Sequence, residues 1–219
     1  VEIGTIAVPC DKIENSGQCM AWGYMEIAEK NFPEAYLILG ANHHSQTKFS
    51  TYLFADWETP FGIVKVNQIL GKELINEFPQ LINEHTAHEK EHSIEIQLPW
   101  LQFASRDKLT ELSFIPLSIN ITTIKEAKIL AEKLNVFKEK NNVAIIASCN
   151  IDDTTTLQYV KSQDTEALIN YKQRKNLEVK EIAPLIVLME LAKLKNKIPH
   201  VINSQAIGKN NYYGCISFK

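Results

Sequence analysis

Apolar positions along the chain fall into short continuous runs and longer segments of helical spacing. Two runs, Ala35–Gly40 and Val143–Ser148, are apolar at almost every position, which is typical of strands buried on both faces of a parallel sheet. Shorter runs of the same kind predict further strands at Gly4–Pro9, Leu112–Ile119, His200–Ala206 and Tyr212–Phe218.

Segments in which apolar residues recur every three or four positions separate these strands. They predict helices at Ser16–Lys30, Ile69–Phe78, His92–Phe103, Thr123–Lys140, Thr154–Arg174 and Ala183–Lys195. A turn at Glu58–Gly62 lies between two short strands, Thr51–Ala55 and Ile63–Val66, and predicts a small antiparallel insertion around residues 50–66. The alternation predicts an α/β fold with a mostly parallel or mixed central sheet and helices on both faces.

The length of 219 residues fits a single domain, residues 1–219, because no repeat or linker interrupts the pattern. The 26 acidic and 23 basic residues give a net charge of −3 without runs of like charge, so nucleic acid and anionic membrane surfaces are not expected partners. The apolar runs are too short for a membrane span, and the first residues lack a signal-peptide pattern. We therefore expect a cytoplasmic location and four free thiols.

Polar residues follow three of the predicted strands, at the end where parallel α/β sheets bind their ligands. These segments begin at Cys10, Asn42–His44 and Cys149. Because such strand ends meet at one edge of a sheet, Cys10, His43, Cys149 and the nearby Asp152 are expected to converge. Sulfur, nitrogen and oxygen donors of this kind suit zinc, copper or iron. The simpler interpretation is that these are ordinary loop histidines and buried thiols.

Residues His88–His92 read H-E-K-E-H and match the H-E-x-x-H pattern of zinc proteases. Both middle positions are charged, although a buried catalytic helix would carry apolar residues there, so a zinc protease is a remote alternative. Glu91 and Glu95 are four residues apart on one helix face. They are equally consistent with a catalytic role and with a solvated face.

Three longer segments carry a specific pattern. They read L-I-L-G-A-N-H-H at Leu37–His44, T-P-F-G at Thr59–Gly62 and E-H-S-I-E-I-Q-L-P-W at Glu91–Trp100. These segments resemble the Memo family, "mediator of cell motility", whose prokaryotic members are called AmmeMemoRadiSam system protein B. The resemblance extends over nearly the whole chain. It implies a fold similar to that of class III extradiol dioxygenases, an iron or copper site with a redox role at the strand ends, and a radical SAM enzyme system as a partner.

The ligand positions of the family's metal site can each be matched to a residue of this sequence. His43 matches a family ligand, whereas Cys10 stands where the family motif P-H-A-G-Y has its histidine. In the family motif S-D-x-x-H, Cys149 replaces the aspartate and Asp152 replaces the histidine. In the motif C-G-x-H-P, Lys180 replaces the cysteine ligand. The signature residues that the resemblance places around the cleft are Asn42, His44, Glu91, His92 and Glu95.

Two hypotheses follow from these changes. In the first, the site has lost its metal, Lys180 supplies an ammonium near the former metal position, and the protein is an accessory that binds a small molecule or a protein partner. Repulsion between a metal dication and a charged lysine, on the order of several kcal/mol at low dielectric, favours this hypothesis.

In the second hypothesis, Cys10 and His43 hold one zinc, copper or iron ion in the rebuilt site of a dioxygenase-like redox enzyme, and Cys10, His43 and His92 are the candidate catalytic residues.

The sequence also lacks the segment that the family usually has ahead of Cys10. Its absence is expected to leave part of the cleft uncovered.

Overall fold

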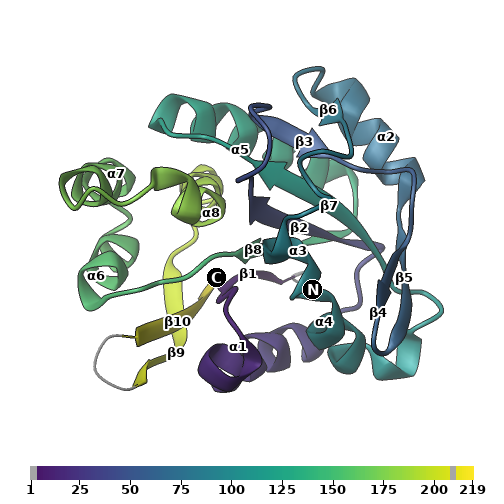
Figure 1. Ribbon diagram of the computed structural model, residues 1–219, viewed down its shortest axis with the longest axis horizontal. Helices are drawn as coiled ribbons and strands as arrows, with labels where there is room; N and C mark the ends of the chain where they lie inside the picture. The colour runs from purple at the N-terminus through teal and green to yellow at the C-terminus, as the bar shows by residue number, and fades with distance from the viewer. Residues whose placement is uncertain (1–3, 208–210) are drawn as a thin grey trace.

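A mixed sheet forms the centre of the computed structural model, which describes residues 4–207 and 211–219 (Figure 1). Its strands are β1 (Thr5–Val8), β2 (Ala35–Ala41), β3 (Phe49–Thr51), β4 (Trp57–Thr59), β5 (Gly62–Val66), β6 (Ile82–Asn83), β7 (Ser113–Ile119), β8 (Val143–Ser148), β9 (Pro199–Ile207) and β10 (Asn211–Phe218). The main strand order is β4-β5-β7-β2-β8-β1-β10-β9. From β5 to β1 all neighbours are parallel, whereas β10 and β9 are antiparallel additions.

The two continuous apolar runs form the middle of this sheet, as predicted. Every residue of β2 and β8 is buried. Ile38 and Ile146 pair across the two strands, and neither has any exposed surface. Each such side chain stabilises the fold by about 1.5–3 kcal/mol relative to exposure, so the parallel centre is rigid enough to position the loops at its edge.

The predicted insertion around residues 50–66 is a hairpin of β4 and β5. Thr59 pairs with Gly62 across its turn, and the φ angle of Gly62, 106°, is one that favours glycine. β5 pairs antiparallel with β4 and parallel with β7 in the main sheet. The predicted strand Thr51–Ala55 is wrong: β3 ends at Thr51 and pairs antiparallel with β7, residues 52–56 form no strand, and the strand before the turn is β4.

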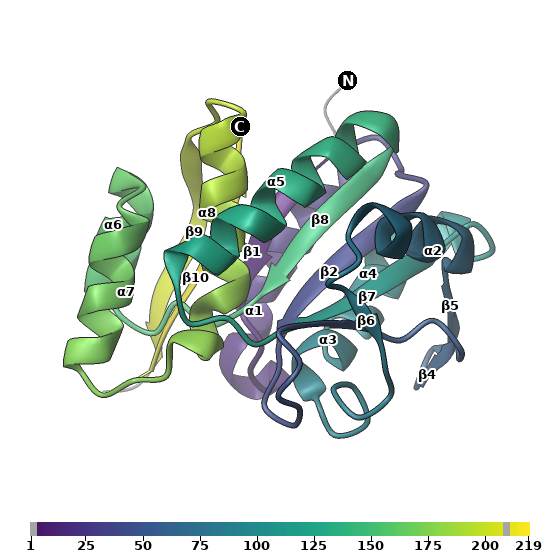
Figure 2. The same cartoon turned by 90° about the horizontal axis from the view of Figure 1, so that it is seen from above.

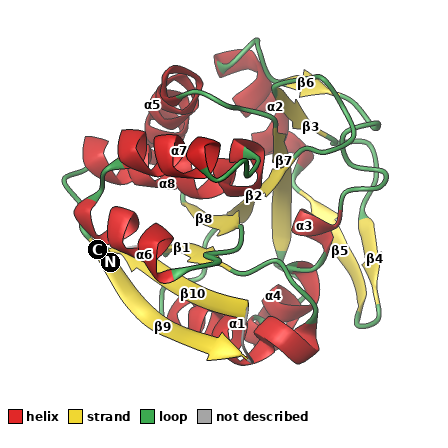
Figure 3. Cartoon of the chain, turned by 60° about the vertical axis from the view of Figure 1, so that its left-hand side comes forward, coloured by secondary structure: helices red, strands yellow, loops and turns green. Residues whose placement is uncertain are grey.

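Helices cover both faces of the sheet (Figure 2). The bounds are α1 (Ile13–Ala28), α2 (Gln68–Glu77), α3 (His92–Glu95), α4 (Leu98–Ala104), α5 (Ile124–Lys140), α6 (Thr154–Ser162), α7 (Thr165–Arg174) and α8 (Ala183–Leu194). In Figure 3, α7 and α8 lie on one side of β1 and β8, and α1 and α4 lie on the other. None of the helices in the described ranges is long and apolar enough to cross a membrane.

Two of the predicted helices are each divided in the structure. The segment His92–Phe103 forms α3 and α4, because Pro99 lies in the first turn of α4 and has no N–H to continue an earlier helix. The segment Thr154–Arg174 forms α6 and α7, because Gln163 has a left-handed backbone with φ 54° and Asp164 caps the helix that follows.

Candidate functional site at the strand ends

The carboxyl ends of β1, β2 and β8 lie side by side. Cys10 follows β1, His43 follows β2 and Cys149 follows β8. The Cys10 N–H donates to Oδ1 of Asn150 at 2.9 Å, and the Cys149 N–H donates to the carbonyl of Val8 at 2.9 Å. The segments that follow β1 and β8 are thus tied together by hydrogen bonds next to the end of β2.

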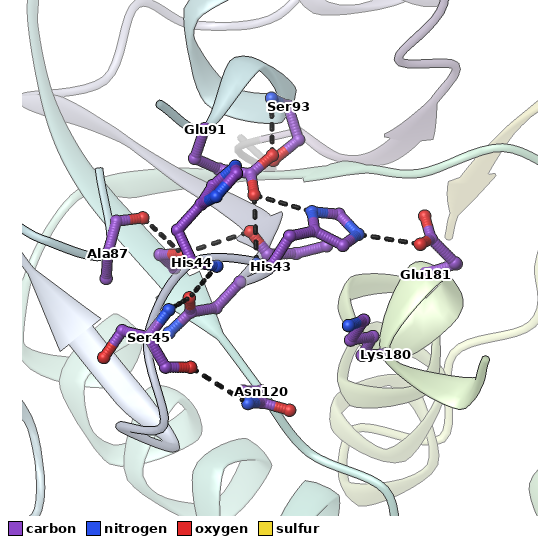
Figure 4. Close-up of polar contacts among 12 residues, drawn as sticks. His43, His44, Ser45, Ala87, Glu91, Ser93, Asn120, Lys180 and Glu181 are labelled. Atoms are coloured by element: carbon purple, nitrogen blue, oxygen red, sulfur yellow. Dashed lines mark hydrogen bonds and ion pairs between the residues drawn. The ribbon is translucent and has the colours of Figure 1, made fainter. Parts of the chain in front are cut away.

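The imidazole of His43 lies between two carboxylates (Figure 4). Its Nδ1 is 2.7 Å from Oε2 of Glu91, and its Nε2 is 2.7 Å from Oε1 of Glu181. The backbone N–H of His43 also donates to the same Glu91 oxygen at 3.2 Å. The three side chains come from the loop after β2, the N-cap of α3 and the short 3₁₀ helix Val179–Ile182.

Glu91 is fixed by the close approach of α3 to the end of β2. A Cβ atom added to Gly40 would lie 2.4 Å from Oγ of Ser93 and 2.6 Å from Cγ1 of Ile94, so only glycine allows this approach. Glu91 is 5% exposed, and its Oε1 accepts the backbone N–H of Ser93 at 3.1 Å as the N-cap of α3. One oxygen of the Glu91 carboxylate therefore caps α3, and the other contacts the ring of His43.

The charges of this trio favour a doubly protonated imidazole. Partial burial alone would lower the pKa of His43, but the hydrogen bonds and negative charges of Glu91 and Glu181 outweigh it, so this pKa lies above 6.5. Burial would raise the pKa of Glu91, but hydrogen bonds from His43 and from the Ser93 N–H hold it below its ordinary value. Both shifts act in the direction of an ion pair between a protonated His43 and an ionised Glu91.

The two thiols at the strand ends are protonated at neutral pH. Burial, followed by the negative charges of Glu181, Glu91 and Asp11, raises the pKa of Cys10 to about 12. Cys149 is only 1% exposed, and burial raises its pKa well above the ordinary value. Because the thiolate is the form that attacks electrophiles and binds metals, neither cysteine is activated in this environment.

Asp152 is paired with a lysine that the sequence analysis did not single out. The side chain of Lys172 on α7 is 2% exposed, and its Nζ donates to Oδ1 of Asp152. The hydroxyl of Thr156 donates to the same oxygen at 3.2 Å. The positive charge of Lys172 acts on Cys149 as well. A buried ammonium group thus lies beside two of the four predicted metal ligands.

Lys180 forms an ion pair with a neighbouring glutamate. Its Nζ is 2.8 Å from Glu178, and it is the neighbouring Glu181 that reaches His43 (Figure 4). The group next to His43 is therefore a carboxylate, and the ammonium near the strand ends comes from Lys172.

The signature residues differ in exposure: Asn42 is buried, whereas His44 and His92 are exposed. Asn42 is fully buried, and its Oδ1 accepts the backbone N–H groups of His44 and Ser45 at 3.2 and 2.9 Å, so it shapes the loop after β2. His44 is exposed beside His43. His92 is 85% exposed, with its Nδ1 3.3 Å from Glu95, and these two residues line a cleft.

The H-E-x-x-H match does not form a zinc-protease site. His88 lies in a turn before α3, is 6% exposed and has its Nε2 3.3 Å from Oγ of Ser50. His92 starts α3 and points into solvent. A zinc-protease pair requires both histidines on one face of a single helix, so this alternative is wrong for the present chain.

A cleft of about 490 Å³ opens next to Cys10. Its walls combine apolar side chains, including Trp100, with the polar groups of Asp11, Thr59, His92 and Glu95. The hydroxyl of Tyr213 on β10 donates to Asp11. The cleft has the size and the mixed lining of sites that take small organic molecules.

The residues do not fit the iron or copper ion that the family resemblance implies. A histidine ligand offers an unprotonated ring nitrogen, whereas both nitrogens of His43 lie 2.7 Å from carboxylate oxygens. The acceptor oxygen of Asp152 is bound by Lys172, and Cys10 and Cys149 retain their protons. In the chain without a metal, both ring nitrogens of His43 and Oδ1 of Asp152 are thus engaged by protein groups, and the thiols of Cys10 and Cys149 are protonated.

Sequence reasoning missed Glu181 and Lys172. Lys172 falls at helical spacing from Leu168 and Thr165, which are the buried face of α7, and this spacing was the available signal. No comparable signal marks Glu181, because its role depends on where the segment before α8 meets the loop after β2.

Comparisons with known proteins agree with the fold and with the family resemblance. A family model described as Memo-like protein matches residues 2–209. The chain is 27% identical to a MEMO1 family protein of Sulfurisphaera tokodaii, over 88% of this chain and 72% of that protein. It is 31% identical to a MEMO1 family protein of Thermotoga neapolitana, over 80% of this chain and 67% of that protein.

A solved structure shows the same fold. The crystal structure of uncharacterized protein JW3007 from Escherichia coli K12 aligns with a TM-score of 0.71 over 100% of both chains, at 13% sequence identity. Together with the match over residues 2–209, these relatives show that the chain belongs to the Memo-like family.

Proposed function

We propose that this chain is an accessory member of the Memo-like family that binds a small organic ligand in the cleft beside Cys10 and works without a bound metal. The observation that carries the proposal is the position of His43, whose two ring nitrogens each lie 2.7 Å from a carboxylate oxygen. When this ring is protonated, each nitrogen donates to one carboxylate, and the ring then has no lone pair to offer a metal.

The electrostatics of the neighbouring residues support the same proposal. The ammonium of Lys172 supplies a fixed positive charge beside Asp152 and Cys149, in a place where a dication would be repelled. His43, Glu91 and Glu181 lie close enough to Cys10 that the two carboxylates raise its pKa. A ligand in the cleft would meet a neutral thiol with a charged imidazole behind it.

The second hypothesis, a redox enzyme with a metal at Cys10 and His43, makes a different prediction that elemental analysis can decide. The full chain is incubated with zinc, copper(I) or iron(II) under reducing conditions, freed of loose metal and analysed, alongside Cys10→Ala and His43→Ala. His44→Ala is the matched control, because it removes the adjacent exposed imidazole.

We expect metal well below one ion per chain in all four proteins. One ion per chain in the wild type and in His44→Ala, lost in both Cys10→Ala and His43→Ala, would refute the metal-free proposal. That result would favour the second hypothesis, in which Cys10 and His43 hold a metal ion.

A further inference from the structure

An aromatic side chain forms one wall of the cleft beside Cys10. Trp100 belongs to α4, which lies beside α1 (Figure 3), and its ring stacks on Tyr24 of α1 with the ring centroids 6.2 Å apart and the planes 16° apart. The hydroxyl of Tyr24 donates to Oε1 of the fully buried Gln97 at 2.9 Å. Contacts from α1 thus hold Trp100 in one orientation, and its half-buried indole offers the cleft an aromatic surface.

A carboxylate in a fixed position lines the same cleft. Oδ1 of Asp11 accepts the backbone N–H of Lys12 at 2.7 Å, and its Oδ2 accepts Nδ2 of Asn15 at 3.1 Å and the hydroxyl of Tyr213. Burial would raise the pKa of Asp11, but these hydrogen bonds outweigh it and hold the pKa below its ordinary value. Asp11 is therefore an anion at neutral pH, and its Oδ1 can accept a further hydrogen bond from a ligand.

A second carboxylate comes from α3. Glu95 lines the cleft together with His92, whose Nδ1 is 3.3 Å from Oε2 of Glu95. The side chain of Glu95 is 59% exposed and that of His92 is 85% exposed, so both lie on the solvent side of the cleft. A ligand that enters from solvent would pass Glu95 before it reaches Asp11.

The charge around the cleft is negative in every protonation state of its histidines. Among the described residues that line the cleft or form the trio of His43 and two glutamates beside Cys10, the charged groups are Asp11, Glu91, Glu95, Glu181, Lys12, His43 and His92. Even when both imidazoles are protonated, the four carboxylates exceed the cationic groups by one. Such a field attracts cations and repels anions.

We propose that the ligand of this cleft is an organic cation, a protonated amine carried on a flat apolar group. This inference rests on the proposed function, which makes the cleft the ligand site. The apolar group would lie against Trp100, and the ammonium would donate to Asp11 or Glu95 in charge-assisted hydrogen bonds. The face of the indole would add a cation–π attraction.

Three ligands with the same ring and different charges test this proposal. Naphthylmethylamine is a cation at pH 7, naphthylmethanol is neutral and naphthoate is an anion. Each is titrated into the ¹⁵N-labelled full chain while the indole N–H signals of its three tryptophans are followed by NMR. The signal of Trp100 is the one that Trp100→Phe lacks. We expect this signal to shift, the amine to bind roughly tenfold more tightly than the alcohol, and naphthoate to bind most weakly.

Two variants test which carboxylates are responsible. Glu95→Gln should reduce the preference for the amine over the alcohol by about threefold, and Asp11→Asn should reduce it as well. Glu89→Gln, at an exposed glutamate outside the cleft, is the matched control and should keep the full preference. If Asp11→Asn does not fold, the comparison of Glu95→Gln with Glu89→Gln still decides.

Equal affinities for the amine and the alcohol, or tighter binding of naphthoate, would overturn the cation proposal and leave the cleft as a site for organic ligands. An amine preference that is unchanged in both Glu95→Gln and Asp11→Asn would overturn it too. A Trp100 signal that none of the three ligands shifts would count against both the cation proposal and the cleft as the ligand site. The metal analysis described above decides separately whether the protein works without a metal.

Discussion

His88 provides a quantitative test of how burial controls protonation in this fold. Its ring lies near Tyr52 and Trp57, with centroid distances of 6.5 and 6.1 Å, and its side chain is buried. Burial lowers the pKa of His88 to about 4, and the hydrogen bond with Ser50 and nearby carboxylates only partly oppose this effect. The residue is therefore neutral in the folded protein well into the acid range.

The magnitude follows from the two pKa values. In the unfolded chain His88 titrates near 6.5, so between about pH 6.5 and pH 4 the unfolded state binds the proton more strongly than the folded state. The stabilising contribution is complete above pH 6.5 and is lost as the pH falls towards 4. At about 1.4 kcal/mol for each pH unit, the loss is roughly 2 kcal/mol by pH 5 and roughly 3 kcal/mol by pH 4.

Urea unfolding at several pH values from 7.5 to 4.5 measures this effect in the wild type and in His88→Phe. The variant has no proton to take up, so its free energy of unfolding should fall by about 2 kcal/mol less than that of the wild type between pH 7 and pH 5. His200→Gln, at an exposed histidine of β9, is the control for removing a histidine as such. Parallel losses of stability in wild type and His88→Phe would refute the reasoning.

Three further predictions concern the strand-end site. In a ¹⁵N NMR titration we expect the pKa of His43 to lie above 6.5 and Glu91→Gln to lower it. The linked stability is complete below pH 6.5 and declines as the pH rises through the folded-state pKa. A wild-type pKa at or below 6.5 would contradict this. Asp152→Asn should lower the free energy of unfolding in urea by about 1–3 kcal/mol, because it removes the negative charge that pairs with buried Lys172. An unchanged urea midpoint would show that the pair does not stabilise the fold. Gly40→Ala should cost about 1–3 kcal/mol and shift the NMR signals of His43, because its methyl group forces α3 off the sheet; unshifted signals would contradict this.

The sequence predicts the parallel centre well because burial on both faces leaves a continuous apolar run, as in β2 and β8. It predicts helix positions better than helix ends. Gln163 ends α6 in a left-handed conformation that no residue type there announces, whereas Pro99 is a visible break. These errors arise because capping and tertiary packing decide where a helix ends, and the spacing of apolar residues along the sequence carries no information about either.

The charged partners of the candidate site residues could not be predicted from the sequence for a similar reason. The residues after β1, β2 and β8 are predictable, because strand ends meet by topology. Glu181 and Lys172 come from segments whose approach depends on how α7 and α8 pack, so their partners, His43 and Asp152, had no predictable charge environment. Their contacts change the interpretation of the site more than any residue in the recognised motifs.

The position of β1 has a consequence for how the chain folds during synthesis. β1 pairs with β8 on one side and with β10 on the other, so its two neighbours are made long after it leaves the ribosome. Contacts this distant in sequence form slowly, because a long loop must close before they are gained. One edge of β1 therefore waits for β8 and the other for β10, and an unpaired strand edge during this interval favours wrong strand pairing.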